Sequence, residues 1–281
     1  MRIASIDDRA SVHTDGKWFD IAAASNGRFE ADMQSLFGNW AELRSWFDEQ
    51  FTPDGLQPIA GKRKAPVPAP SQVFGVGLNY ADHAAEAGMD LPKTPLIFPK
   101  FSSCIAGPDD ILILDSDTVD WEVELVAVIG RKCHGVPADH AWDYVAGLTI
   151  GQDISDRTLQ WSDASTPQFG LGKSKTGYGP IGPEIVTVDE LADPESLSID
   201  CAVNGQTVQH SNTRHLIFDV PALVSYLSRI VTLHPGDLIF TGTPSGVGMT
   251  RSPARYLADG DVLSSEIEGI GVLLTTARVV R

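Results

Sequence analysis

Nine short apolar runs follow one another between residue 71 and the end of this 281-residue chain, and their spacing strongly constrains the fold. Each run is rich in Val, Ile, Leu or Phe and is bounded by turn-forming residues, which is typical of β-strands. Only two clear helical patterns lie among them, at residues 139–146 and 218–231. Because strands and helices do not alternate regularly, the sequence predicts an α+β domain, predominantly β, and argues against a doubly wound nucleotide-binding fold. The nine runs cover residues 71–78, 95–101, 110–115, 123–130, 147–154, 184–188, 197–205, 237–243 and 272–280.

The first 60 residues have a pattern of their own. MRIASIDD and KWFDIAAA predict strands, and NWAELRSWFDEQF has the apolar spacing of an amphipathic helix. Four prolines between residues 58 and 70 then favour an extended linker. We therefore predict a small N-terminal α+β domain with its linker at residues 1–70, and a catalytic domain at residues 71–281.

Composition limits the partners and the location of the protein. The chain has 37 acidic and 21 basic residues, and the formal net charge of −16 argues against nucleic acid, which Lys and Arg recognise. No apolar run reaches the ~18 residues that span a bilayer, and the N-terminus lacks a signal-peptide pattern. We expect a cytoplasmic protein without a membrane partner. The odd, widely spaced cysteines Cys104, Cys133 and Cys201 favour reduced, buried thiols.

Two glycine-rich segments, GVGLNY and GTPSGVGM, do not meet the requirements of phosphate-binding loops. The first has Tyr80 where a dinucleotide fingerprint needs its third glycine, and the second lacks a terminal Lys-Ser or Lys-Thr. Both segments are better explained as turns that line a cleft.

The segment DWEVELVAVIG places two carboxylates at the start of a buried strand. Because strand side chains alternate, Glu122 and Glu124 share one face, where they would repel each other unless a positive charge intervened. Asp153 follows in another strand-like run, and three carboxylates form the hard oxygen donor set that Mg²⁺ or Mn²⁺ prefers. The alternative, that the pair is the polar face of an edge strand, stays open on the pattern alone.

The segment Tyr80–Ala87 predicts a short Ala-rich helix with little apolar surface to bury. His83 and Glu86 lie three residues apart on one side of it, so the carboxylate can support the imidazole as a general base. Lys173 lies between glycines and would be able to bind a carboxylate or an oxyanion. A solvated helix face and an ordinary surface lysine are the alternatives for these residues.

Seven segments, taken in order, resemble the fumarylacetoacetate hydrolase family over roughly residues 71 to 281. The segments are NYADHAAE, PKFSSCIAGP, WEVELVAVIG, TIGQDISDRTLQ, GKSKTGYGPIGP, VNGQTVQHSNTRHLIFD and LIFTGTPSGVG. The small N-terminal unit also resembles the variable leading domain of many members. The resemblance implies a mixed β-sandwich roll and a homodimer.

The same resemblance assigns roles to individual residues. It implies that Glu122, Glu124 and Asp153 bind Mg²⁺ or Mn²⁺. It also implies a catalytic His-Glu pair on a lid helix, which corresponds here to His83 and Glu86. The active-site lysine corresponds to Lys173, and substrate contacts are implied for Arg157, Gln160 and Thr243. Two departures prevent the substrate from being carried over: Lys100 is followed by Phe101 where many members have proline, and residues 160–174 differ from other versions of this loop.

The implied activity is a metal-dependent hydrolase that cleaves a C–C bond in a 2,4-dioxo acid. An acylpyruvate or a 2,4-diketo-3-deoxy sugar acid would be cleaved through a metal-stabilised pyruvate enolate, by water activated by His83 and Glu86. Decarboxylation of an oxaloacetate-like acid and isomerisation of a dienoic diacid stay open, since both would use the same site. A catalytically silent binding protein would be expected to lack His83, Glu86 or Lys173, and all three are present.

Overall fold

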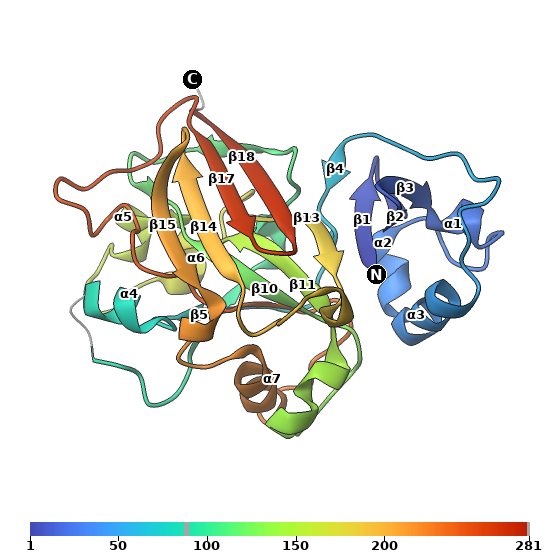
Figure 1. Ribbon diagram of the computed structural model, residues 1–281. Helices are drawn as coiled ribbons and strands as arrows, with labels where there is room; N and C mark the ends of the chain where they lie inside the picture. The colour runs from blue at the N-terminus through green and yellow to red at the C-terminus, as the bar shows by residue number, and fades with distance from the viewer. Residues whose placement is uncertain (87–89, 280–281) are drawn as a thin grey trace.

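The computed structural model describes residues 1–86 and 90–279, and two large sheets packed against each other form its centre (Figure 1). The larger sheet has eleven strands, in the order β3-β2-β1-β13-β11-β10-β16-β5-β6, with β4 paired to β1 and β7 to β13. Its strands are β1 (Arg2–Ile6), β2 (Arg9–Thr14), β3 (Lys17–Asp20), β4 (Arg63–Lys64), β5 (Val73–Gly77), β6 (Leu96–Lys100), β7 (Ile105–Ala106), β10 (Val123–Ile129), β11 (Val145–Gln152), β13 (Gly179–Val186) and β16 (Leu238–Phe240).

The second sheet has five strands in the order β15-β14-β17-β18-β8. They are β8 (Ile111–Leu114), β14 (Ser198–Val203), β15 (Gln206–Asn212), β17 (Val262–Ile267) and β18 (Gly271–Val279), while β9 (Val119–Asp120) and β12 (Ser155–Asp156) form a separate pair. The nine predicted runs each contain or overlap a strand. Strands β15 and β17 were not predicted, because β15 is largely polar and β17 interrupts its apolar residues with SSE.

Helices are short and lie at the periphery of the sheets. The α-helices are α1 (Ile21–Ala24), α2 (Met33–Phe37), α3 (Trp40–Glu49), α4 (Ala81–Glu86), α5 (Arg157–Gln160), α6 (Phe169–Gly172) and α7 (Val220–Ser228). The pattern at 218–231 correctly predicts α7, but the pattern at 139–146 forms a 3₁₀ helix, Ala138–Tyr144, before β11 begins. No helix in the described part of the chain is long and apolar enough to cross a membrane. The predicted α+β class with predominant β-structure is confirmed.

Strand β10 is buried on both faces and divides the core in two. Val123 and Leu125 belong to the cluster between the two sheets, whereas Val126 and Val128 belong to a second cluster shared with the N-terminal helices. This alternation is the period-two pattern of a central strand. It places Glu124 on the same face as Val126, near the start of β10.

The N-terminal unit extends the larger sheet. In Figure 1 its strands and helices lie to one side of the two sheets, and β1 pairs antiparallel with β13, with Arg2 opposite Val186. Trp40 and Trp46 of α3 are buried in the second cluster, so this unit packs against the rest through apolar contacts. The predicted division at residue 70 stays a prediction. The cysteines are buried thiols, as predicted.

Candidate active site

Strands β10 and β11 bring the three predicted metal ligands together. They pair antiparallel with Val123 opposite Gln152, and the N–H of Asp153 donates to the carbonyl of Glu122 at 2.9 Å. Glu122 therefore precedes β10 directly and Asp153 follows β11 directly, so the two lie opposite each other. Each of Glu122, Glu124 and Asp153 offers one carboxylate oxygen, and these three oxygens lie within 4.8 Å of one another.

Two lysines hold Asp153 and Glu122 by direct ion pairs. Lys173 Nζ lies 2.7 Å from Glu122 Oε2 and 2.7 Å from Asp153 Oδ2. Lys100 Nζ lies 2.5 Å from Asp153 Oδ1 and also donates to the main-chain carbonyls of Lys173 and Tyr178. Both lysine side chains are almost completely buried, so their charges are not screened by bulk water.

Glu124 differs from its neighbours in its partners. It accepts a hydrogen bond from the N–H of Gly242 at 2.8 Å, and no lysine or arginine within the described residues forms an ion pair with it. Burial raises the pKa of Glu124 well above its ordinary value, and the carboxylates of Asp153 and Glu122 raise it further. Burial also disfavours ionised Glu122, but the charges of Lys173 and Arg157 outweigh it and hold its pKa at about 2.

This distribution of charge fits a divalent cation. Three buried carboxylates from adjacent strands form a hard oxygen donor set, and one of them has no cationic partner among the residues that the structure describes. A positive charge at this point would stabilise ionised Glu124 and relieve the repulsion between the carboxylates. The residues thus fit Mg²⁺ or Mn²⁺, while their role as ligands stays a prediction.

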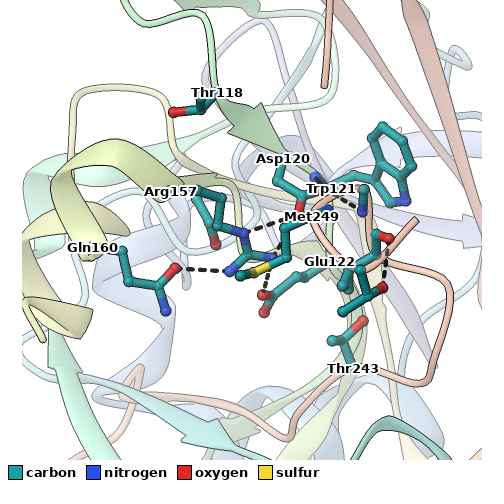
Figure 2. A network of polar contacts seen from close by, with 12 residues as sticks. Thr118, Asp120, Trp121, Glu122, Arg157, Gln160, Thr243 and Met249 are labelled. Carbon is teal, nitrogen blue, oxygen red and sulfur yellow. Dashed lines mark hydrogen bonds and ion pairs between the residues drawn. The ribbon is translucent and has the colours of Figure 1, made fainter. Parts of the chain in front are cut away.

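Arg157 is the centre of a buried polar network (Figure 2). Its Nε donates to Asp120 Oδ2 at 2.9 Å, its Nη2 to Glu122 Oε1 at 2.7 Å, and its Nη1 to Gln160 Oε1 at 2.8 Å. Asp120 also accepts the N–H groups of Gly248 and Met249 at 2.7 and 3.0 Å. Arg157 was predicted to contact substrate, and in this structure its guanidinium mainly fixes Glu122 and the loop at 248–249.

Helices α5 and α6 are clamped together and aim Lys173 at the carboxylates. The N–H of Gln168 donates to the carbonyl of Gln160 at 2.8 Å, which closes the loop between the two helices. A Cβ at Gly172 would lie 2.9 Å from Gln160 Cβ, so only glycine allows α6 to approach α5 this closely. The glycine before Lys173 therefore serves helix packing.

Thr243 lies beside the carboxylates with its hydroxyl already occupied. Its Oγ1 donates to the carbonyl of Val123 at 2.8 Å and accepts from Gln209 Nε2 at 2.8 Å. Gln209 Oε1 in turn accepts the N–H of Val123 at 3.0 Å. The Thr243 side chain thus anchors its loop to the start of β10, and its predicted contact with substrate would use the main chain or the methyl group.

Helix α4 presents the predicted acid–base pair. His83 Nδ1 lies 3.3 Å from Glu86 Oε2, and the N–H of Gly246 donates to Glu86 Oε1 at 3.1 Å. Burial opposes ionisation of Glu86, but hydrogen bonds from His83, Thr250 and Gly246 lower its pKa overall. The predicted helix ran to Ala87, which lies outside the described residues.

A cavity of about 520 Å³ connects the pair with the buried charges. His83 and Glu86 line it, and so do five predicted residues from the rest of the site: Glu122, Arg157, Gln160, Lys173 and Thr243. Both glycine-rich segments contribute residues to its wall, as predicted, through Gly77 and Met249 among others. The structure therefore places an imidazole, a lysine and Glu122, one member of the carboxylate cluster, around one space.

The contacts of α4 predict how easily it opens. Tyr80, just before it, is fully buried, but the helix itself is held by polar contacts near solvent, such as Ser245 Oγ to Asp82 Oδ2 at 3.0 Å. Segments with few apolar contacts open at low free-energy cost. We expect fast amide hydrogen exchange in α4 in the free protein and slower exchange with Mg²⁺ and oxalate, while α7 stays protected in both. Strong protection of α4 without ligand would instead indicate a purely structural helix.

Sequence reasoning missed two residues of the site. Lys100 was noted only for the residue that follows it, and Asp120 was treated only as the first residue of the strand segment. An isolated lysine in an apolar strand such as LIFPK is costly to bury without a partner, so LIFPK itself was a usable signal for Lys100. The position of Asp120 gave no such signal, because its partner Arg157 comes from a distant segment.

Comparison with known proteins agrees with this geometry. A family model described as fumarylacetoacetate (FAA) hydrolase C-terminal matches residues 72–279. The rat oxaloacetate tautomerase Fahd2a, mitochondrial, is 48% identical over 212 residues, which cover 75% of this chain and 67% of the relative. A crystal structure of a Mycobacterium smegmatis protein provisionally assigned as HpcE has a TM-score of 0.95 and 48% identity, with both chains fully covered.

A more distant solved structure carries ligands. Maleylpyruvate hydrolase from Sphingobium sp. SYK-6, in complex with manganese(II) and pyruvate, has a TM-score of 0.82 and 28% identity, again with both chains fully covered. The fold, the order of the motifs and the family model lead to one assignment: this chain belongs to the fumarylacetoacetate hydrolase family.

Proposed function

We propose that this protein is a divalent-metal-dependent enzyme that moves a proton at C3 of a 2-oxo acid, which interconverts its keto and enol forms. The observation that carries the proposal is a cavity lined by the His83–Glu86 pair, by Lys173 and by Glu122, which is one of the three clustered carboxylates. Enolisation needs a base near C3 and positive charge near the 2-oxo group, and the cavity offers both.

Each group has a distinct part in this proposal. Glu86 holds Nδ1 of His83, so Nε2 is the ring nitrogen left to take and return the C3 proton. A bound Mg²⁺ or Mn²⁺ would supply Lewis-acid polarisation of the 2-oxo group. Lys173, fixed between Glu122 and Asp153, places an ammonium beside the oxygen on which negative charge develops.

Tautomerisation is the first candidate for the complete reaction. It requires only the proton transfer, and the rat relative at 48% identity is named an oxaloacetate tautomerase. Isomerisation of a dienoic diacid and decarboxylation, both raised by the sequence, would share the same proton transfer or the same enolate.

Hydrolysis of a C–C bond in a 2,4-dioxo acid is the second candidate. The His83–Glu86 pair favours it, because hydrolysis needs a base that activates water, and the pair lies at the wall of the cavity rather than deep in the cluster. The related maleylpyruvate hydrolase, solved with manganese(II) and pyruvate, supports this reading as well. Homodimerisation and a cytoplasmic location also remain proposals.

Proton exchange in D₂O tests the shared step directly. With Mg²⁺ present, NMR should show enzyme-dependent exchange of the C3 protons of pyruvate, oxaloacetate or acetylpyruvate with solvent deuterium. Product analysis on the same samples then separates tautomerisation from cleavage and decarboxylation. If none of these acids exchanges faster than in enzyme-free buffer, the proposed function is wrong.

A further inference from the structure

Three aromatic rings lead outward from Lys173 along one wall of the cavity. Lys173 Nζ lies 5.5 Å from the centre of the Phe98 ring. The rings of Phe98 and Phe169 stack with centres 5.9 Å apart, and Trp161 meets Phe169 edge-on at 5.6 Å. We call Phe98, Phe169 and Trp161 the aromatic wall. All three residues line the cavity that holds the candidate active site.

The inner end of the aromatic wall is rigid and its outer end is open. Phe98 is 7% exposed and packs directly on the main chain of β5, where a Cβ at Gly75 would lie 2.3 Å from its ring. At the other end Trp161 is 39% exposed and Leu96 is 40% exposed. Large apolar side chains left open at the mouth of a cavity are typical of a binding surface.

The charges along this wall are already neutralised. Arg157 and Lys173 are the only arginine and lysine among the described residues that line the cavity, and both form ion pairs with buried carboxylates. A second carboxylate of a ligand placed against the aromatic wall would lose its water without gaining a lysine or arginine partner from the described lining residues. An apolar group in the same place would gain free energy from burial.

We propose that the aromatic wall binds an apolar substituent at the end of the substrate remote from its 2-oxo acid group. The substrates are then monocarboxylic 2-oxo acids with an acyl, alkyl or aryl tail, rather than dicarboxylates such as oxaloacetate. The proposal rests on the proposed function for the orientation of the ligand, with the 2-oxo acid group at Lys173. A cavity of about 520 Å³ falls within the ~300–1,000 Å³ typical of drug-sized ligands, so a four-carbon dicarboxylate would leave much of it empty.

Titration calorimetry with a matched set of 2-oxo acids tests whether an apolar tail increases the affinity. With Mg²⁺ present, the probes are pyruvate, 2-oxohexanoate and 2-oxoglutarate, the last two being similar in length but ending in a methyl and a carboxylate. Each buried methylene contributes up to about fourfold in affinity, so 2-oxohexanoate should bind at least about tenfold more tightly than pyruvate. 2-Oxoglutarate should bind no more tightly than pyruvate. Equal affinities for pyruvate and 2-oxohexanoate, or tighter binding of 2-oxoglutarate than of 2-oxohexanoate, would overturn the inference.

Substitutions in the aromatic wall show whether it is the tail site. In Phe169→Ala the preference for 2-oxohexanoate over pyruvate should fall to about two- to threefold, and Phe169→Arg should reverse the order of 2-oxohexanoate and 2-oxoglutarate. Phe101→Ala, which removes a ring that is 55% exposed and outside the cavity, is the matched control and should keep the preference. Phe169→Leu, which keeps an apolar side chain, should also keep it. An unchanged preference in Phe169→Ala would show that the tail binds elsewhere.

The failure of this inference can be told apart from failure of the proposed function. If pyruvate binds and its C3 protons exchange, but longer apolar tails add no affinity, only the assignment of the aromatic wall is wrong. If neither pyruvate nor any longer 2-oxo acid binds in the presence of Mg²⁺, the proposed function itself is wrong.

Discussion

Replacing Glu124 by glutamine should abolish tight binding of Mg²⁺ or Mn²⁺ and lower turnover of any 2-oxo acid by about 10³-fold or more. The substitution keeps the size of the side chain but removes the one carboxylate of the cluster that has no cationic partner among the described residues. Lewis-acid stabilisation is worth several kcal/mol, and each 1.36 kcal/mol changes a rate tenfold. Titration calorimetry measures the metal affinity. Glu266→Gln, at an exposed position of β17, is the matched control. Unchanged metal affinity in Glu124→Gln would remove this residue from the ligand set.

The same variant should be more stable than the parent protein when metal is absent. In the unfolded chain Glu124 ionises near its ordinary pKa of 4.5, whereas burial and the adjacent carboxylates raise its pKa in the folded protein. Between these two values the folded state binds more protons, so its stability falls as the pH rises through this window. Glutamine removes this loss. At pH 8 and in a chelator we expect a higher Tm, by about 2–4 °C for each kcal/mol gained, and a smaller difference near pH 4.5.

Replacing His83 by alanine should lower C–C hydrolysis about 10²–10⁴-fold, the usual cost of losing a positioned general base. Metal binding should persist, because His83 lies on α4 and is not one of the three clustered carboxylates. Decarboxylation needs no attacking water, so any activity towards oxaloacetate should fall much less. C3 proton exchange should fall together with hydrolysis, because His83 Nε2 is the proposed base for enolisation.

The comparison of several activities in one preparation separates chemistry from folding. His140→Ala is the matched control, since His140 is 63% exposed and lies 3.6 Å from Asp143 on the surface. Equal loss of hydrolysis, exchange and decarboxylation in His83→Ala would mean that His83 positions α4 or the substrate, and its role as base would have to be abandoned.

The sequence predicts the parts of this molecule whose physics is local. The apolar run from Leu125 to Ile129 specifies a doubly buried strand by itself, and the two-residue period then places Glu122 and Glu124 on one face. The approach of Asp153 depends on the register of β10 with β11, which no local pattern encodes. Asp153 was predicted as a ligand from the resemblance to a family and from its residue type.

The ion-pair partners of the buried charged residues could not be predicted from the sequence. Arg157 was predicted to contact substrate, but in the structure it forms an ion pair with Asp120. Lys100 had no predicted role, and it forms an ion pair with Asp153. These pairs join segments separated by 37 and 53 positions, so their formation depends on the complete fold. A local pattern can also be insufficient. At residues 138–144 the apolar spacing correctly predicts a helical segment, but it does not predict that the segment is a 3₁₀ helix.

The hydrogen bond between Gln160 and Gln168, which holds α5 against α6, separates the charged residues of the site from the loop at residues 161–167. The hydrogen bond between Gln168 N–H and the Gln160 carbonyl joins the two ends of the loop formed by residues 161–167. The charged residues Arg157 and Lys173 lie outside this loop, one on each side of it in the sequence. Loops closed in this way tolerate insertion and replacement at little cost in free energy. The 161–167 loop can therefore be replaced, in evolution or by protein engineering, to change the range of substrates while the ion pairs of Arg157 and Lys173 stay in place.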